Sequence, residues 1–400
     1  MRLEYLAVRN VLAKPINLTI NLLLLVLSIS LVTFVLQFSA QINGQLNKNI
    51  APLDMVVGAK GSPLQLVLSS VLHIDAPTGN IKLQEAEQII KHPFVGSAIP
   101  VSYGDNYKGY RVLGTELDYF DSYQAELAEG RFFTQPFEVV AGSMVAKKLN
   151  LKLGDIFVSS HGLVAVGGEL HNDKPFTVVG ILEPTGTVVD KLLVANLESV
   201  WEAHDHEEED HHEEDHHQED LEITSLLVKF KSPLGLVQLP RFVNENTNMQ
   251  AALPRYEIQR LSGLLGTGVK TINSIAFGIL LVSGLSILLS LAKTIRERRQ
   301  ELALLRTYGL GTKKLLYVIL VEGMFLAVFG FLLGWLLGRL SLFLASGYIE
   351  SSYGYALEIN GPQWIDFQLF GATLFIALIA IFLASTPIFR LNISKTLVDD

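Results

Sequence analysis

The chain has 400 residues, a formal net charge of −9, a mean hydropathy of +0.35 and no cysteine. The lack of cysteine excludes disulfides and thiolate metal sites, and the excess of acid argues against a nucleic-acid partner. Its apolar residues gather in a few long stretches, which excludes an ordinary soluble protein.

Four stretches are apolar enough to cross a bilayer, which requires about 20 apolar residues per helix. They cover residues 17–40, 271–292, 315–345 and 367–389. The first could be a cleaved signal peptide, but it is longer than the apolar core of such a peptide, so we expect it to be retained. The sequence predicts four transmembrane helices in a 1+3 layout, with residues 41–270 inserted after the first.

The positive charges predict the orientation, because short loops rich in Lys and Arg stay in the cytoplasm. Residues 1–16, 293–314 and 390–400 are rich in them, whereas residues 41–271 hold 18 Lys and Arg against 31 Asp and Glu. We therefore expect both termini in the cytoplasm and residues 41–270 and 346–366 outside. Residues 1–16 have apolar side chains at helical spacing, which predicts an amphipathic helix on the cytoplasmic surface.

The large external region predicts an α+β domain of two lobes. Strand-like runs such as 54–58 and 176–182 alternate with helix-like runs such as 83–92 and 143–149. The glycine-rich runs at 58–62 and 266–271 lack the Walker A spacing that binds a nucleotide. We therefore do not expect the chain to be an enzyme by itself.

Residues 204–217 are unlike the rest, because all of them are His, Asp or Glu: six His and eight acids. Imidazole and carboxylate together suit Zn²⁺ and related divalent ions, and a cation would relieve the repulsion between the acids. The candidate metal ligands are His204, His206, His211, His212, His216 and His217. A solvated acidic insertion is the alternative. The HExxH pattern within this low-complexity run does not predict a protease.

Residues 293–314 predict a short helix with one apolar face. Leu302, Leu305 and Tyr308 recur at helical spacing, Leu304 lies beside them, and Gly309 follows as a stop signal. No helix breaker stands between residues 295 and 299, so the second span is expected to run on without interruption. Such a helix suits docking into a groove on another protein, or else lies flat on the lipid surface.

The third span carries two unusual features. Gly330, Gly334 and Gly338 form a stripe of small residues at i, i+4 and i+8, which permits close approach of another helix. Glu322 lies within the span, where an acid must face a neighbouring helix or a bound subunit. Arg339 is near the outer end and receives no role.

Residues 298–309 are similar to the segment through which FtsX-like permeases contact their ATPase. The run Gly130-Arg131-Phe132, residues 139–149, Gly154-Asp155 and residues 176–182 also resemble this family. Its members are membrane subunits of ABC systems such as the MacB efflux and lipoprotein-release machines. The resemblance implies ATPase contact through Arg298, Glu301, Leu304, Leu305, Arg306 and Gly309.

We accordingly expect a permease subunit in a bacterial inner membrane, which couples ATP hydrolysis by a separate subunit to motions of its periplasmic domain. The histidine tract adds a link to zinc or another divalent metal. The expected partners are an ABC ATPase, which binds the ATP, a second permease copy, lipids and a periplasmic accessory protein; no cofactor is expected to be covalently bound. The alternatives are extraction or efflux of lipoprotein, peptide or drug, an FtsX-type scaffold that controls a cell-wall hydrolase, and a stand-alone metal sensor.

Overall fold

The computed structural model describes residues 9, 15–161, 174–204, 221–308, 310–353 and 361–386. The chain divides into two compact units. One, the helical unit, comprises residues 1–42 and 265–400, and the other, the α/β unit, comprises residues 43–264. The expected amphipathic helix at 1–16, apart from isolated positions, and the tail at 390–400 lie outside the described residues.

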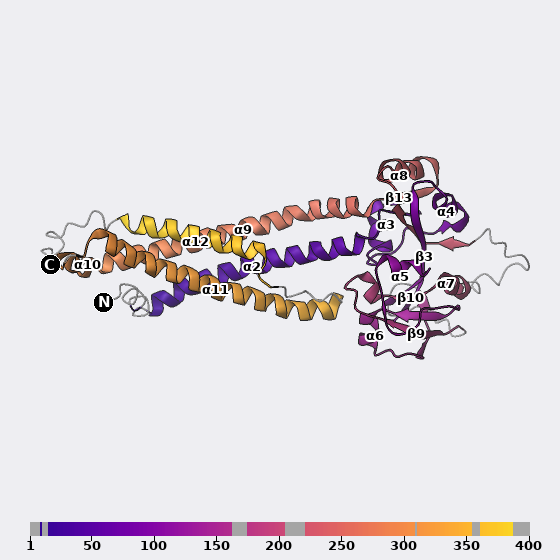
Figure 1. Ribbon diagram of the computed structural model, residues 1–400, viewed down its shortest axis with the longest axis horizontal. Coiled ribbons are helices and arrows are strands. Elements are labelled where there is room, and N and C mark those ends of the chain that lie inside the picture. Colours follow the sequence, from indigo (N-terminus) through magenta and orange to yellow (C-terminus); the bar gives the residue numbers. More distant parts are fainter. Residues whose placement is uncertain are drawn as a thin grey trace, which may run out of the picture. The chain divides into compact units, whose positions relative to one another are not determined.

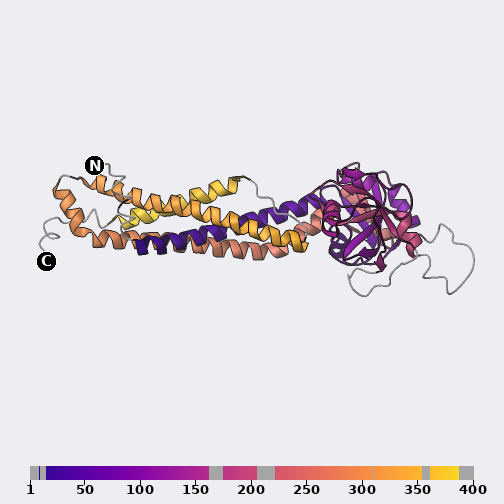
Figure 2. The same ribbon diagram turned by 90° about the horizontal axis from the view of Figure 1, so that it is seen from below.

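Four helices of the described chain are long and apolar enough to cross a membrane. They are α2 (Pro15–Ile50), α9 (Pro254–Glu297), α11 (Thr312–Tyr353) and α12 (Trp364–Ala384), and they run alongside one another in both side views (Figures 1 and 2). Helices α2, α9 and α11 extend well past the apolar stretches. The reason is that hydropathy marks only the part suited to hydrocarbon, whereas polar residues such as those at 41–50 continue a helix until Pro52.

The helical unit has an apolar core to which all four spans contribute. Leu25 and Ile29 of α2, Leu280 and Ile287 of α9, Phe331 of α11 and Ile381 of α12 belong to one buried cluster. Polar contacts supplement it: the hydroxyl groups of Ser28 and Ser283 lie 2.6 Å apart and join α2 to α9.

The α/β unit contains many short elements inserted between α2 and α9. Its strands are β1 (Met55–Ala59), β2 (Ile81–Lys82), β3 (Val95–Tyr107), β4 (Tyr110–Thr115), β5 (Leu127–Gly130), β6 (Glu138–Ala141), β7 (Ile156–Phe157), β8 (Ser160–His161), β9 (Phe176–Leu182), β10 (Leu193–Asn196), β11 (Glu222–Ile223), β12 (Ser225–Phe230) and β13 (Met249–Ala252). Its helices are α3 (Pro63–Ser70), α4 (Leu83–Ile90), α5 (Asp118–Ser122), α6 (Ser143–Leu149), α7 (Leu197–His204), α8 (Gly235–Asn246) and the 3-10 turn Val188–Lys191.

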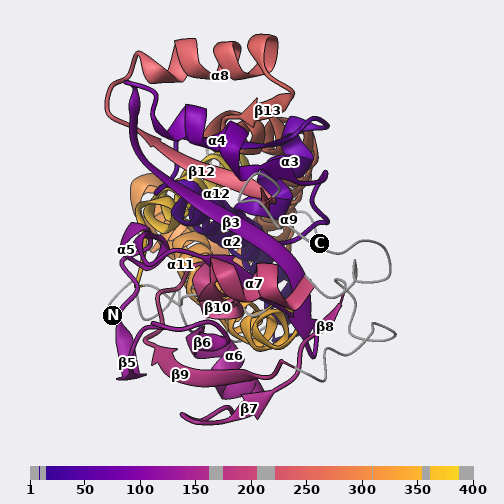
Figure 3. The same cartoon turned by 90° about the vertical axis from the view of Figure 1, so that its right-hand side faces the viewer.

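Within the described residues, a mixed sheet runs through this unit in the order β13-β1-β12-β3-β4-β10-β6-β9-β5, with β7 paired to β9 and β8 to β3. Strands β2 and β11 pair separately in a small second sheet. The 13-residue strand β3 crosses the middle of the unit (Figure 3). Its first half, Val95–Val101, pairs with β12, and its second half, Val101–Tyr107, pairs with β4. The two expected lobes therefore share one sheet, because one strand is long enough to serve both.

Alternating side chains of the strands supply separate cores on the two faces of the sheet. On β1, Val56 belongs to one buried cluster, while Met55 and Val57 belong to another. This is the two-residue period of a strand covered on both faces. Leu239 of α8 and Ile89 of α4 pack into the second cluster. A third cluster lies where Val145 of α6 meets β6, β9 and β10.

Candidate coupling site

The chain turns sharply where α9 ends. Helix α9 stops at Glu297, and a shorter helix, α10 (Arg299–Thr307), follows after Arg298, whose backbone has φ −101° and ψ 19°. The expectation of an uninterrupted helix from 295 to 299 is therefore wrong. The break coincides with a tertiary contact that the local sequence does not reveal: the Arg298 side chain forms an ion pair with Glu322 of α11, 24 positions later.

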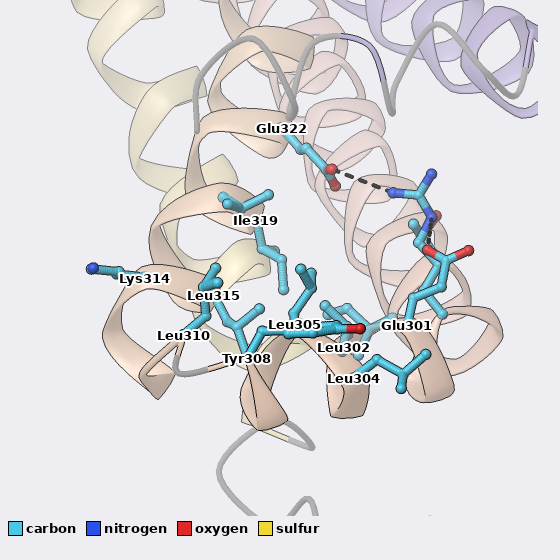
Figure 4. A pocket seen from close by; sticks show the side chains of 14 residues that line it. Glu301, Leu302, Leu304, Leu305, Tyr308, Leu310, Lys314, Leu315, Ile319 and Glu322 are labelled. Carbon is cyan, nitrogen blue, oxygen red and sulfur yellow. Dashed lines mark ion pairs between the residues drawn. The ribbon is translucent and has the colours of Figure 1, made fainter. Parts of the chain in front are cut away.

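A cavity of about 600 Å³ lies between the end of α9, α10 and the start of α11. Figure 4 shows Leu302 and Leu305 of α10 lying across the cavity from Leu315 and Ile319 of α11. Glu322 marks one end of it, and Lys314 and Glu301 lie on opposite sides. The lining is thus apolar in the middle and charged around its edge.

The charged side chains at this cavity differ strongly in exposure. Arg298 is 16% exposed and its guanidinium lies 3.8 Å from the carboxylate of Glu322, which is 6% exposed. The same guanidinium lies 3.7 Å from the carboxylate of Glu301, which is 71% exposed. Glu322 therefore faces a neighbouring segment of its own chain, and Arg298 is directed into the bundle rather than outward.

Two of the apolar side chains that line this cavity, Leu304 and Tyr308, are also exposed to the outside. Leu304 is 47% exposed and Tyr308, just after the helix, is 82% exposed, whereas Ala303 is fully buried. Leu302, Leu305 and Arg306 are partly buried. Gly309 lies outside the described residues. An exposed leucine and tyrosine beside a cavity give α10 a surface that suits contact with another protein.

The glycine stripe of α11 lies directly against α2. A methyl group on Gly330 would overlap Leu25, one on Gly334 would lie 2.7 Å from Ile29, and one on Gly338 would lie 2.8 Å from the backbone of Ser30. These distances are shorter than any normal carbon contact, so the two helices can approach this closely only because the positions are glycine.

Arg339, to which the sequence assigned no role, belongs to a polar cluster linking three spans. Its guanidinium donates to the Asp366 carboxylate of α12 at 2.9 Å, and the Gln37 side chain of α2 donates to the same carboxylate at 2.9 Å. Arg339 also lies over the Trp335 ring. The signal available in the sequence was an Arg and an Asp near the outer ends of consecutive spans.

Of the six candidate metal ligands, the structure describes one. His204 is the last residue of α7, and His206, His211, His212, His216 and His217 lie outside the described residues. Within the described ranges, no group of three or more His, Asp or Glu side chains is arranged to hold a metal ion.

The motif at Gly130-Arg131 organises a turn in the α/β unit. The Arg131 guanidinium pairs with the Glu138 carboxylate, which also accepts from the backbone N–H groups of Thr134 and Gln135. These hydrogen bonds, that from Arg131 first, lower the pKa of Glu138 to about 2. The motif is thus accounted for by the folding of a loop.

Comparison with known families accounts for both units. The MacB-like periplasmic core domain family matches residues 18–235, and the FtsX-like permease C-terminal family matches residues 273–393. The chain belongs to the MacB- and FtsX-like ABC transporter permeases. Members of this family are transport permease subunits that work with an ABC ATPase, and the four spans with an inserted domain fit an inner-membrane protein.

Among individual relatives, the permease is 22% identical over 294 residues to the lipoprotein-releasing system transmembrane protein LolC of Neisseria meningitidis serogroup B, covering 69% of this chain and 67% of that protein. The periplasmic region of MacB from Actinobacillus actinomycetemcomitans matches 54% of this chain and 97% of its own, with a TM-score of 0.34 and 16% identity. The extracellular domain of YknZ from Gram-positive bacteria matches 49% of this chain and 98% of its own, with a TM-score of 0.31 and 13% identity.

Proposed function

We propose that this permease is the membrane subunit of an ABC-type mechanotransmission machine, in which a separate ATPase binds α10 and drives motions of the α/β unit. The observation that carries the proposal is the exposed surface formed by Leu304 of α10 and Tyr308 directly after it, on a segment set off from α9 by a break. An exposed apolar pair on a two-turn helix is an anchor for a groove on another protein.

The rest of the helical unit supports the same function. Helices α2 and α9 each have residues in both units, and a continuous helix carries displacement along its axis. A cycle of ATP binding and release at α10 would act on the end of α9, from which α10 is separated by a single residue. Direction of transport does not enter this mechanism, since the same parts serve import, export and extraction.

The test is capture of the ATPase by full-length permease in detergent. The ABC ATPase that co-purifies with the wild-type chain is first identified. It is then produced together with the Leu304→Asp or the Tyr308→Asp permease, and its affinity for each permease is measured. Each variant places a charge in an apolar contact and should weaken capture at least about ten-fold, as expected for a residue central to an interface.

The matched control is Arg241→Glu on α8 of the α/β unit, a side chain that is 77% exposed. This variant should bind the ATPase as the wild type does. Equal capture by Leu304→Asp, Tyr308→Asp and the wild type would show that α10 is not the ATPase surface.

A link to zinc rests on the composition of residues 204–217 alone. We propose that this tract binds several divalent ions loosely, so that the machine handles zinc or a zinc-dependent periplasmic partner. Calorimetry of the full chain with Zn²⁺ should lose this uptake when residues 204–217 are deleted, and below about pH 6, where protonated imidazole no longer ligates. Equal uptake after deletion would contradict the proposal.

A second candidate is handling of lipoprotein, with the histidine tract as an incidental insertion. It is favoured by the match to LolC, which is described as part of a lipoprotein-releasing system. The two candidates differ in one observable. Deleting residues 204–217 should leave lipoprotein release intact and should abolish any zinc-dependent activity.

A further inference from the structure

Two oppositely charged side chains meet inside the helical unit where α10 begins. Arg298 stands at the break between α9 and α10, and Glu322 lies on the third turn of α11. The two groups are 3.8 Å apart, and both are largely removed from solvent, at 16% and 6% exposure. The ion pair links the end of α9 to α11, two segments that the chain otherwise connects through α10 and the loop after it.

A pair in this position resists separation. When two charges lie largely out of water, separating them costs free energy, because their attraction is strong in a medium of low dielectric. The nearby pair of Lys293 and Glu297 offers a direct contrast, because its groups are 3.9 Å apart but 62% and 40% exposed. Water can replace either partner of that exposed pair, so it transmits little force.

Arg298 lies where a change in the tilt of α10 would move its side chain. Its backbone has left the helical conformation, so a change in the angle between α9 and α10 would be centred on this residue. A change in the tilt of α10 would displace the Arg298 guanidinium, and the attraction between the two charges would draw Glu322 after it. On α11, Gly323 comes next, and a methyl group there would lie 2.5 Å from Ile381 of α12 and 3.1 Å from Leu291 of α9.

We propose that the Arg298–Glu322 ion pair is the positioning link through which a displacement of α10 moves the third span, α11. This proposal rests on the proposed function, in which the ATPase binds α10. In this arrangement Arg298 acts inside the helical unit and does not contact the ATPase directly, whereas Leu304 and Tyr308 form the surface that contacts it.

The experiment measures ATPase capture and span movement separately in the full-length complex. Because the chain has no cysteine, spin labels can be attached at cysteines replacing Tyr348 of α11 and Trp364 of α12, which are 71% and 77% exposed. The distance between the labels is compared in the nucleotide-free and vanadate-trapped complexes. The rate of permease-stimulated ATP hydrolysis is recorded in parallel.

Glu322→Gln should keep ATPase capture but lose the nucleotide-dependent change in label distance, and stimulated hydrolysis should fall by about ten-fold, the size of a typical coupling between sites. The exchanged pair Arg298→Glu with Glu322→Arg should restore both. The control pair Lys293→Met with Glu297→Gln should behave as the wild type does. A normal distance change in Glu322→Gln would overturn the link.

A third variant separates coupling from folding. Arg298→Met with Glu322→Leu removes both buried charges, so it should be as stable as the wild type and capture the ATPase, yet lack the distance change. If this variant showed the full change, the pair would be merely structural and the proposal would fail. Failure of the wild-type permease to capture the ATPase through α10 would instead overturn the proposed function.

Discussion

Gly130 and Gly154 share a left-handed backbone, with φ +84° at each, but differ in their surroundings. A methyl group on Gly130 would overlap the carbonyl oxygen of Val179 and lie 3.0 Å from the Cα of Gly180, whereas one on Gly154 meets nothing within 4 Å. Gly154 is therefore required by its backbone conformation alone, whereas Gly130 is required both by its conformation and by the lack of space for a side chain.

Both alanine substitutions should destabilise the α/β unit, but by different amounts. Gly154→Ala should cost about 1–2 kcal/mol, the penalty for a left-handed L-residue. Gly130→Ala adds overlap with the backbone of β9, which should cost about 1–3 kcal/mol more. Native-state hydrogen exchange of β5 and β9 in the full chain measures both. Equal losses would show that the loop relaxes away from the overlap.

His73 has both ring nitrogens next to tyrosine hydroxyl groups, with Nδ1 2.8 Å from Tyr103 and Nε2 3.2 Å from Tyr119. The Tyr103 hydroxyl also donates to the carbonyl oxygen of Ser70. Burial, with a smaller effect from the Arg111 charge, lowers the pKa of His73 to about 3. The imidazole is therefore neutral in the folded chain.

This lowered pKa predicts loss of stability in acid. Between the folded pKa and the unfolded value of 6.5, only the unfolded chain takes up the proton, so stability rises with pH across this window and falls as pH drops below 6.5. The contribution of His73 should destabilise the unit by about 1 kcal/mol between about pH 7.5 and about pH 5.5.

His73→Asn tests this contribution, because Asn does not titrate and tolerates the left-handed backbone at this position, where φ is 54°. The variant should lose less stability than the wild type on the same change of pH, measured by hydrogen exchange of β3 and β4. The same acid-induced loss in both proteins would show that His73 is not the group responsible.

At the scale of elements, the spans are fastened by polar contacts as well as by apolar packing. Asp366 accepts from Arg339 of α11 and from Gln37 of α2, and it also caps its own helix, α12, by accepting from the backbone of Gln363. Arg339 and Asp366 are 13% and 7% exposed, so the pair is largely out of solvent. Removing one partner leaves the other charge largely buried without the opposite charge that lies 2.9 Å away.

A double-mutant cycle should reveal this dependence. Arg339→Met and Asp366→Leu should each destabilise the helical unit by about 3–5 kcal/mol, whereas the double variant should lose much less than their sum because no buried charge remains. Unfolding of the detergent-solubilised chain measures the three free energies. Additive losses would mean that the two charges do not stabilise each other.

At the scale of the whole molecule, the distribution of charge predicts on which side of the membrane the α/β unit and α10 lie. Asp121 of the α/β unit and Gln300 of α10 are both exposed, and the chain has no cysteine of its own. An impermeant maleimide should label Asp121→Cys in intact spheroplasts and Gln300→Cys only after the membrane is disrupted. Labelling of Gln300→Cys in intact spheroplasts would invert the expected orientation and remove the basis for an ATPase at α10.

Local pattern was enough to identify many elements of the chain. The spans follow from apolar length, and β9 and α6 begin and end where alternation and helical spacing place them. These are properties of neighbouring residues, and each is imposed by backbone geometry within a few positions. The short helix after the second span was likewise predictable from the sequence, since its leucines recur at helical spacing.

Contacts between distant residues were decided by the tertiary structure. The sequence did not reveal that β3 is long enough to join both halves of the sheet, nor that the helix breaks at Arg298, nor that Arg298 meets Glu322. It also left Arg339 without the partner found 27 positions later, in Asp366. The physical reason is that a buried charge is stable only beside an opposite charge. Which residue supplies that charge depends on how the helices pack, and the local periodicity of the sequence does not determine their packing.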